Sequence, residues 1–281
     1  PAGAAGSIVA VSDYASTANT NNIVVSPNGS DKINGENETY KISTNGLAVT
    51  LVYADATRGW KSVTGSDADA TGVGTLYVTA TGGTPCAGAT SGDYKIHSFT
   101  GPGTLTVSCG GNACGSNTID YMVVAGGGGG GSDYAGGGGA GGYRESVPSP
   151  AAWTSSPIAK SGGAVPVTAT PYAIVVGGGG TAGSGDNTRG GSGSVSSFST
   201  ICSAGGGGGA AEGGPSDGID GGSGGGGGYT GGTPPLSNGG AGNTPPTVPA
   251  QGFAGGTGAT GAPGYGAGGG GGASEVGETA P

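Results

Sequence analysis

The sequence has little charge, few basic residues and no long apolar run. Only 9% of its 281 residues are charged, and 8 Lys and Arg stand against 17 Asp and Glu, which gives a formal net charge of −9. Nucleic-acid binding depends on basic side chains that neutralise phosphates, so we expect no nucleic-acid partner. No apolar run reaches the roughly 18 to 20 residues that span a bilayer, so we expect no membrane span. The chain begins at Pro1 without the layout of a signal peptide, and we expect a piece of a longer protein.

Cysteine and histidine are scarce as well. The four cysteines are too few for a disulfide scaffold and form no CxxC pair of the kind that binds zinc. Cys109 and Cys114 flank a Gly-Gly-Asn-Ala stretch, which turns tightly enough to bring two Cβ atoms within bonding range. A disulfide between them and two free thiols both fit the sequence. We expect no metal site and no cofactor.

Glycine is what the sequence has instead. The chain contains 74 Gly, of which 18 lie in residues 1–125 and 56 in residues 126–281. Gly costs roughly 1 kcal/mol relative to Ala inside a helix, and runs such as 126–131 break the strict repeat of collagen. We therefore expect a mostly β fold with essentially no α-helix. The expected parts are a β module at 1–64, a β-rich connection at 65–125 and a glycine-rich domain at 126–281.

The first part of the chain has the pattern of antiparallel β-strands. Short runs rich in β-branched and aromatic residues alternate with turn signals such as Asn45-Gly46. The runs lie at 23–25, 40–43, 49–53, 75–79, 94–99 and 104–107. About 60 residues at the front look too polar to bury a core alone, and oligomerisation is the usual remedy. The residues expected to need partners for burial are Val24, Ile42, Val49, Leu51 and Trp60.

Part of the β module at 1–64 resembles a known protein module. Residues 26–35, followed by 40–46 and 49–53 up to Arg58-Gly59-Trp60, resemble a small β module that recurs in bacteriophage tail fibres. That resemblance covers roughly residues 20–64. It implies a homotrimer in a fibrous assembly.

The glycine-rich part requires a choice between a flexible linker and an ordered structure. Low hydrophobicity and high Gly content are typical of linkers. However, three Gly runs follow strand-like apolar segments at 119–125, 171–176 and 198–204. A linker has no reason to repeat such anchors, so we expect residues 126–281 to be folded.

Polyglycine II helices offer an ordered structure for this part. Such a helix has three residues per turn and rises about 3.1 Å per residue without internal hydrogen bonds. Its N–H and C=O groups point outward, so several helices bond side by side. Only Gly permits axes this close, because a Cβ would separate them. The Gly runs at 126–131, 136–139, 177–180, 205–209, 224–228 and 268–272 fit this lattice.

Segments of a different character separate the Gly runs. Residues 143–171, 229–236, 243–253 and 262–265 contain Pro, Ser, Thr and aromatics, and we expect loops at the ends of the lattice. Their aromatic side chains either cap the lattice or contact a ligand. The candidate receptor-binding residues are Tyr143, Trp153, Tyr229, Phe253 and Tyr265.

A second resemblance covers the chain from about residue 92 onward. Residues 94–107, 117–131 and 140–145 look like the glycine-rich domain of bacteriophage tail-fibre and tail-tip proteins. In the related polyglycine-sandwich adhesins, loops at the lattice ends contact the host surface. The likeness to those adhesins lies in Gly runs and loops, so it transfers no receptor residue. It implies an extracellular place on the virion tail fibre, with other virion proteins and a host glycan or outer-membrane protein as partners.

The sequence matches several catalytic and metal-binding motifs only in part. Residues 221–225 match the GxSxG nucleophile elbow, but a Gly- and Ser-rich tract produces it by chance and His97 lies upstream. Residues 185–192 resemble a phosphate loop without its Lys. Asp67 with Asp69, and Asp217 with Asp220, supply too few ligands for Ca²⁺. We expect no enzyme activity.

Two functions therefore compete. The first is a phage tail-fibre structural protein and host-binding adhesin. The alternative is a non-phage glycine-rich structural or ice-binding protein. An ice-binding face must be flat and regular, whereas Pro pairs and aromatics interrupt these Gly runs.

Overall fold

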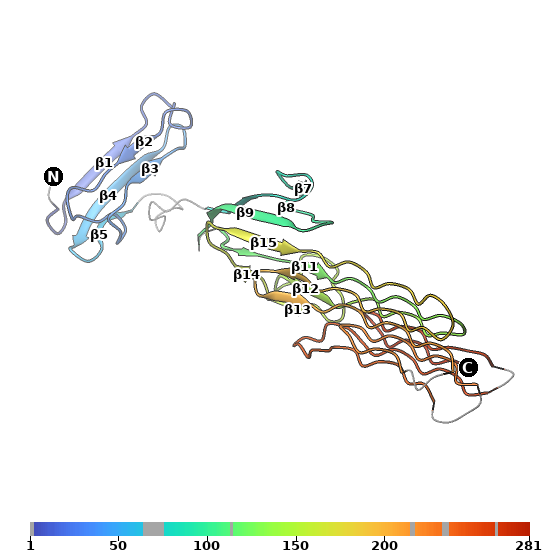
Figure 1. Cartoon of the computed structure of the whole chain (residues 1–281). Coiled ribbons are helices and arrows are strands. Elements are labelled where there is room, and N and C mark those ends of the chain that lie inside the picture. Colours follow the sequence, from blue (N-terminus) through green and yellow to red (C-terminus); the bar gives the residue numbers. More distant parts are fainter. Residues whose placement is uncertain (1–2, 64–75, 113–114, 214–216, 232–235, 262–263) are drawn as a thin grey trace. The chain divides into compact units, whose positions relative to one another are not determined.

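The computed structural model describes residues 3–63, 76–112, 115–213, 217–231, 236–261 and 264–281. Within these ranges the chain forms β-strands and no α-helix, in agreement with the prediction from its Gly content. The chain divides into two compact units (Figure 1). The first comprises Pro1–Leu76 with Asn112–Ser116, and the second comprises Tyr77–Gly111 with Asn117–Pro281. Most of the predicted connecting part, 65–125, thus shares a unit with the glycine-rich region.

The first unit contains a three-stranded antiparallel sheet in the order β1-β4-β5 and a hairpin of β2 and β3. Its strands are β1 (Ile8–Ser12), β2 (Ile23–Val25), β3 (Tyr40–Ile42), β4 (Ala48–Asp55) and β5 (Gly59–Ser62). β3 and β4 alternate buried and less buried residues because successive side chains of a strand point to opposite faces. Their buried residues meet between the two layers.

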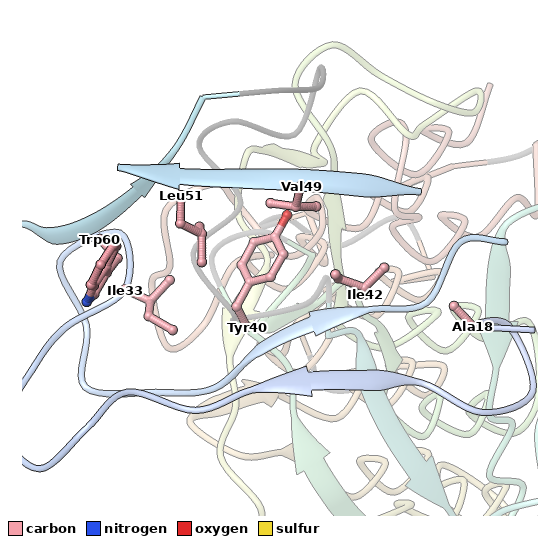
Figure 2. Packing of buried hydrophobic residues seen from close by; sticks show 7 residues of the cluster. All are labelled: Ala18, Ile33, Tyr40, Ile42, Val49, Leu51 and Trp60. Carbon is pink, nitrogen blue, oxygen red and sulfur yellow. The ribbon is translucent and has the colours of Figure 1, made fainter. Parts of the chain in front are cut away.

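This unit closes a hydrophobic core of its own. Figure 2 shows side chains of β3 and β4 pointing toward one another, with Ile33 and Trp60 beside them. The expectation that partners must bury this set was wrong for four of its five residues. Ile42, Val49 and Leu51 are at most 2% exposed and Trp60 is 7% exposed, whereas Val24 is 55% exposed. The β2–β3 hairpin covers one face of the β1-β4-β5 sheet and buries these side chains within the same chain. The number of apolar residues alone does not predict this cover.

The β part of the second unit forms several small sheets. The largest has the order β17-β16-β15-β9-β6, and a second has the order β11-β12-β13, in which β12 and β13 are parallel. β7 pairs with β8, and β10 pairs with β14. The bounds are β6 (Val78–Thr81), β7 (Ala89–Ser91), β8 (Tyr94–Ile96), β9 (Gly103–Gly110), β10 (Thr118–Ile119), β11 (Met122–Val124), β12 (Tyr143–Val147), β13 (Lys160–Ser161), β14 (Val165–Pro166), β15 (Pro171–Val175), β16 (Ser196–Phe198) and β17 (Ile201–Ser203).

The three predicted anchors are strands that meet in one core. β11, β15 and the β16–β17 hairpin supply Val123, Ile174 and Phe198 to a cluster that also contains Leu105. Each anchor is followed by a glycine-rich segment, so the sheets hold one end of the lattice. One interpretation was wrong: residues 143–171 are not simply a loop, because β12, β13 and β14 lie within them.

Glycine segments extend from these sheets side by side, and their outer ends lie near the C-terminus (Figure 1). They bond to one another through their backbones. We call them the glycine lattice. Its segments are residues 126–131, 136–142, 177–183, 188–194, 204–210, 217–222, 223–230, 237–243, 251–259, 266–272 and 275–281.

The hydrogen bonds of segment 126–131 repeat every three residues. Gly126 and Gly129 donate to the segment 188–194, with N···O distances of 3.0 and 2.9 Å. Gly128 and Gly131 donate to 136–142 at 2.8 and 3.1 Å. A period of three is that of the polyglycine II helix, in which residues one turn apart face the same neighbour.

Segment 223–230 lies at the centre of the lattice. Backbone bonds join it to six neighbouring segments, which are 136–142, 204–210, 217–222, 237–243, 251–259 and 266–272. Six neighbours is the number expected when rods pack hexagonally. Some of these neighbours are parallel to it and others antiparallel. Because the helix has similar bonding directions all round, both orientations fit.

The interior requires Gly for lack of space. A Cβ built on Gly207 would overlap the carbonyl oxygen of Ile219, and one on Gly225 would overlap that of Gly208. Both obstacles are backbone atoms, which cannot turn aside as a side chain does. At the exposed Gly178, by contrast, a Cβ would meet no atom within 4 Å. The need for Gly is therefore a property of the interior.

Candidate functional site

The glycine lattice has two different ends. At the near end, the segments continue from or into the sheets, as at β11 before residue 126 and β12 after residue 142. At the far end, turns such as 132–135 and 184–187 reverse the chain. Among the described residues, no β-strand lies at the far end. Exposed side chains there are carried by segments whose backbones are hydrogen-bonded to one another.

Three tyrosines form a cluster at the far end. The ring centroids of Tyr134 and Tyr229 lie 6.1 Å apart, those of Tyr134 and Tyr265 5.5 Å, and those of Tyr229 and Tyr265 5.3 Å. These are ordinary distances for aromatic pairs. We call Tyr134, Tyr229 and Tyr265 the far-end cluster. They come from segments about 95 and 36 residues apart in sequence, so the lattice itself assembles the cluster.

The members of the far-end cluster differ in exposure. Tyr229 is buried at 7% exposure, whereas Tyr134 and Tyr265 are 57% and 56% exposed. The N–H of Tyr229 donates to the carbonyl oxygen of Tyr134 at 3.0 Å, which fixes one backbone against the other. Tyr229 thus supports two rings that face solvent. Of these three residues, Tyr229 and Tyr265 were predicted as site residues and Tyr134 was missed.

The remaining predicted aromatics lie toward the near end and apart from the cluster. Tyr143, in β12, donates its hydroxyl to Glu145 Oε2 at 3.1 Å, and the same carboxylate oxygen accepts the N–H of Ser156 at 3.0 Å. Burial, followed by the charge and hydrogen bond of Glu145, raises the pKa of Tyr143 to about 12. The Tyr143 hydroxyl therefore stays protonated at neutral pH and donates to Glu145, whose carboxylate ties Ser156 of the 148–159 loop to β12.

Trp153 and Phe253 are held by different contacts. Trp153 is 37% exposed and packs edge to face against Tyr94 of β8, with ring centroids 5.5 Å apart. The backbone of Phe253 belongs to the lattice, since its N–H donates to Gly272 and its carbonyl accepts from Gly224. Its side chain is half-buried. The structure therefore brings together two of the five predicted residues.

Ser223, the centre of the GxSxG match, lies inside the lattice. Its side chain is fully buried, and its hydroxyl lies 2.9 Å from the carbonyl oxygen of Gly141 and 3.2 Å from that of Gly272. A hydroxyl in this position joins two glycine segments to the central one. Its contacts are those of a structural residue in the lattice.

Asp217 and Asp220 also take part in lattice bonding. The carboxylate of Asp217 accepts the N–H of Asn238 at 2.7 Å, and that of Asp220 accepts the N–H of Ala241 at 2.6 Å. The spacing of three residues again matches one helical turn. Within the described ranges, His, Cys, Asp and Glu side chains form no group of three or more that could hold a metal ion. Asp67 and Asp69 lie outside the described residues.

The predicted disulfide involves one residue outside the described ranges. Cys109, in β9, is half-buried, and Cys86 and Cys202 are exposed. Cys114 lies outside the described residues, so the Cys109–Cys114 bond stays a prediction.

Comparison with known proteins places most of the chain in one family. The model of a glycine-rich domain matches residues 100–281, which include most of the β part of the second unit and the whole lattice. No curated protein and no solved structure matches the chain. In the part of the chain that the structure describes, no helix could serve as a membrane span. Since the match covers well over half of the 281 residues, the chain belongs to the glycine-rich domain family.

Proposed function

We propose that this protein is a phage tail-fibre structural protein and an adhesin that binds the host cell surface through the far end of its glycine lattice. Its place is then extracellular, on the virion tail fibre, and other tail proteins are its partners there. Binding rather than catalysis is its role. The sequence resemblances described above supply the phage context of this proposal.

The observation that carries the proposal is the far-end cluster. Tyr134 and Tyr265 expose more than half of their surfaces at the far end, where the residues that the structure describes form no strand. Aromatic rings give large contact areas at low entropic cost. Loops on a rigid scaffold are the usual place for binding residues. A hydrogen-bonded lattice with little side-chain chemistry inside offers its ends as the surfaces for recognition.

The proposed assembly is a homotrimer formed through the first unit. The core of that unit is already closed, so the contact surface must be an outer one. Ile8 lies opposite Val52 across β1 and β4, and Val63 donates its N–H to Thr50 of β4. Ile8 and Val63 are 67% and 55% exposed. This outer face of the β1-β4-β5 sheet offers apolar surface to neighbouring copies.

Light scattering of the full chain tests the assembly. We expect a mass of three chains of 25.6 kDa, and Ile8→Asp should shift it to that of a single chain. A single-chain mass for the unchanged protein would contradict the trimer.

Adsorption of the purified full chain to a panel of bacterial strains tests the adhesin. We expect saturable binding to some strains, competed by unlabelled protein. Failure to bind any strain, from protein whose lattice is folded, would contradict the proposal. A thermal-hysteresis assay separates the ice-binding alternative, since we expect no hysteresis from a lattice interrupted by Pro pairs and aromatics.

A further inference from the structure

From the far-end cluster we infer a binding site for a neutral hexopyranose of a cell-surface glycan. The inference rests on the proposed adhesin function and names its ligand class. Tyr134 and Tyr265 offer exposed rings, and Tyr229 beneath them holds the pair in place. The C–H face of a pyranose stacks on such rings, because it presents apolar hydrogens to the negative face of an aromatic system.

Backbone strain at Tyr134 indicates that its side chain is required. The turn that joins residues 126–131 to 136–142 has Asp133 at φ 55° and Tyr134 at φ 24°. Positive φ is uncommon for residues other than Gly and costs free energy for a bulky one. The chain contains 74 Gly, yet this turn uses Tyr. A residue kept in an unfavourable conformation where Gly would fit without strain points to a use for its ring.

The charges near the cluster favour a neutral sugar over an acidic one. Asp133 is exposed beside Tyr134, and Glu212 precedes Gly213, whose N–H donates to the carbonyl oxygen of Tyr229 at 3.0 Å. Carboxylates accept hydrogen bonds from sugar hydroxyls and repel uronic acids. Arg189 is the only basic residue in positions 126–142 and 177–281. Its guanidinium already donates to the carbonyl oxygen of Asp217.

A groove next to Tyr265 provides room for further sugar units. It has a volume of about 380 Å³, and the threonines in its lining are Thr257, Thr260 and Thr279. Pro281 also lines it and lies within reach of Gly264 and Gly266, the two neighbours of Tyr265. Hydroxyl groups donate and accept hydrogen bonds, as sugar hydroxyls do. The rings and the groove together fit a short oligosaccharide.

Binding of the full chain to immobilised hexasaccharides tests the site. One set contains the neutral sugars glucose, galactose and mannose, and the other contains uronic acids. We expect binding to at least one neutral hexasaccharide and to no uronic one. The double variant Tyr134→Gly with Tyr265→Ala should weaken that binding at least tenfold, while Trp153→Ala, at the near end, should leave it unchanged.

Thermal unfolding separates recognition from capping. Tyr134→Gly removes the ring and the strain together, so a binding role predicts an unchanged or raised Tm with weaker sugar binding. A lowered Tm with unchanged sugar binding would show that the ring only caps the lattice and would overturn the inference. Binding of uronic sugars in preference, or of no hexasaccharide at all, would overturn it too.

Periodate oxidation of the cells distinguishes this inference from the adhesin function. If oxidation of the cell glycans abolishes adsorption, the adhesin function and the saccharide site are both supported. Adsorption that survives periodate but not protease treatment leaves the adhesin and overturns the saccharide site. Sugar binding without adsorption to any strain leaves the saccharide site and contradicts the adhesin.

Discussion

The first unit and the glycine lattice hold together by different means. In the first unit, Ile42, Val49 and Leu51 fill a core of apolar side chains between two layers. At the centre of the lattice, segment 223–230 meets its neighbours through backbone bonds, and its Gly residues leave no room for side chains. Hydrophobic burial stabilises the first unit. The glycine lattice is stabilised by hydrogen-bonded backbone groups and by the close approach of its chains. The two should therefore respond to different substitutions.

The largest expected effect is that of a side chain placed inside the lattice. Gly207→Val should prevent the lattice from folding, because its Cβ would overlap the carbonyl oxygen of Ile219. Overpacked cores typically lose about 1 to 3 kcal/mol, and here rigid backbone blocks relaxation, so we expect a larger loss. Gly178→Val is the matched control, since open space surrounds its Cβ.

Amide hydrogen exchange is the measurement for this pair. In the unchanged protein and in Gly178→Val, the bonded N–H groups of Gly128 and Gly129 should exchange slowly. In Gly207→Val this protection should be lost. Equal protection in all three proteins would contradict the described lattice.

A smaller loss is expected from a cavity in the first unit. Leu51→Ala should lower its free energy of unfolding by about 2 to 5 kcal/mol, as buried Leu to Ala changes do. Calorimetry should show this as a shift of one transition, with the lattice transition in place. A common shift of both transitions would show that the two units unfold together.

Inside the lattice, removal of one buried hydroxyl should lower the free energy of unfolding by less than the Leu51→Ala cavity does in the first unit. Ser223→Ala removes the hydroxyl that bonds the carbonyl oxygen of Gly141, whereas that of Gly272 still accepts the N–H of Phe253, and we expect a loss of about 1 to 3 kcal/mol in the free energy of unfolding. Ser274→Ala, at an exposed site, is the control. Chemical denaturation monitored at the lattice tyrosines measures both. No difference between the two variants would contradict a structural role for the buried hydroxyl.

The smallest expected effect is a pH dependence in the first unit. The N–H of Ala18, followed by those of Gly46 and other residues, bonds the Asp13 carboxylate and lowers its pKa. The folded state thus favours the charged form. This contribution is present above the ordinary aspartate pKa of about 3.9 and is lost as the pH falls through the lower folded value.

Thermal unfolding between pH 7 and pH 2 measures this effect. The Tm of the first unit should fall more steeply below about pH 4 in the unchanged protein than in Asp13→Asn. Parallel curves for the two proteins would contradict the role of Asp13.

In the first unit, the sequence predicted the positions of most β-strands, but it did not predict which strands pair. The strands at 40–42 and 48–55 follow from β-branched and aromatic alternation. β1 has a similar pattern at Ile8–Ser12 but was not recognised. Its partner, β4, lies some forty residues away, and neither the β1–β4 pairing nor the cover that the β2–β3 hairpin gives the sheet can be deduced from local pattern.

The lattice was predictable as a structure but not in its arrangement. Gly runs after strand-like anchors indicated bundled polyglycine II helices. Which run bonds to which could not be deduced, because one Gly offers a neighbour the same groups as any other. Tyr134 was missed for a related reason. It lies between two Gly runs, 126–131 and 136–139, but its turn of four residues, 132–135, is too short to stand out as a loop.

The three-residue period of the lattice bonds limits how such a chain can change in length. Deleting one residue from segment 126–131 would rotate every later amide by about 120°, away from its acceptor and toward another neighbour. Deleting three would restore each direction and shorten the segment by about 9 Å. Insertions and deletions that preserve this fold should therefore come in whole helical turns. The lattice can then grow or shrink during evolution while the turns at its far end keep their orientation.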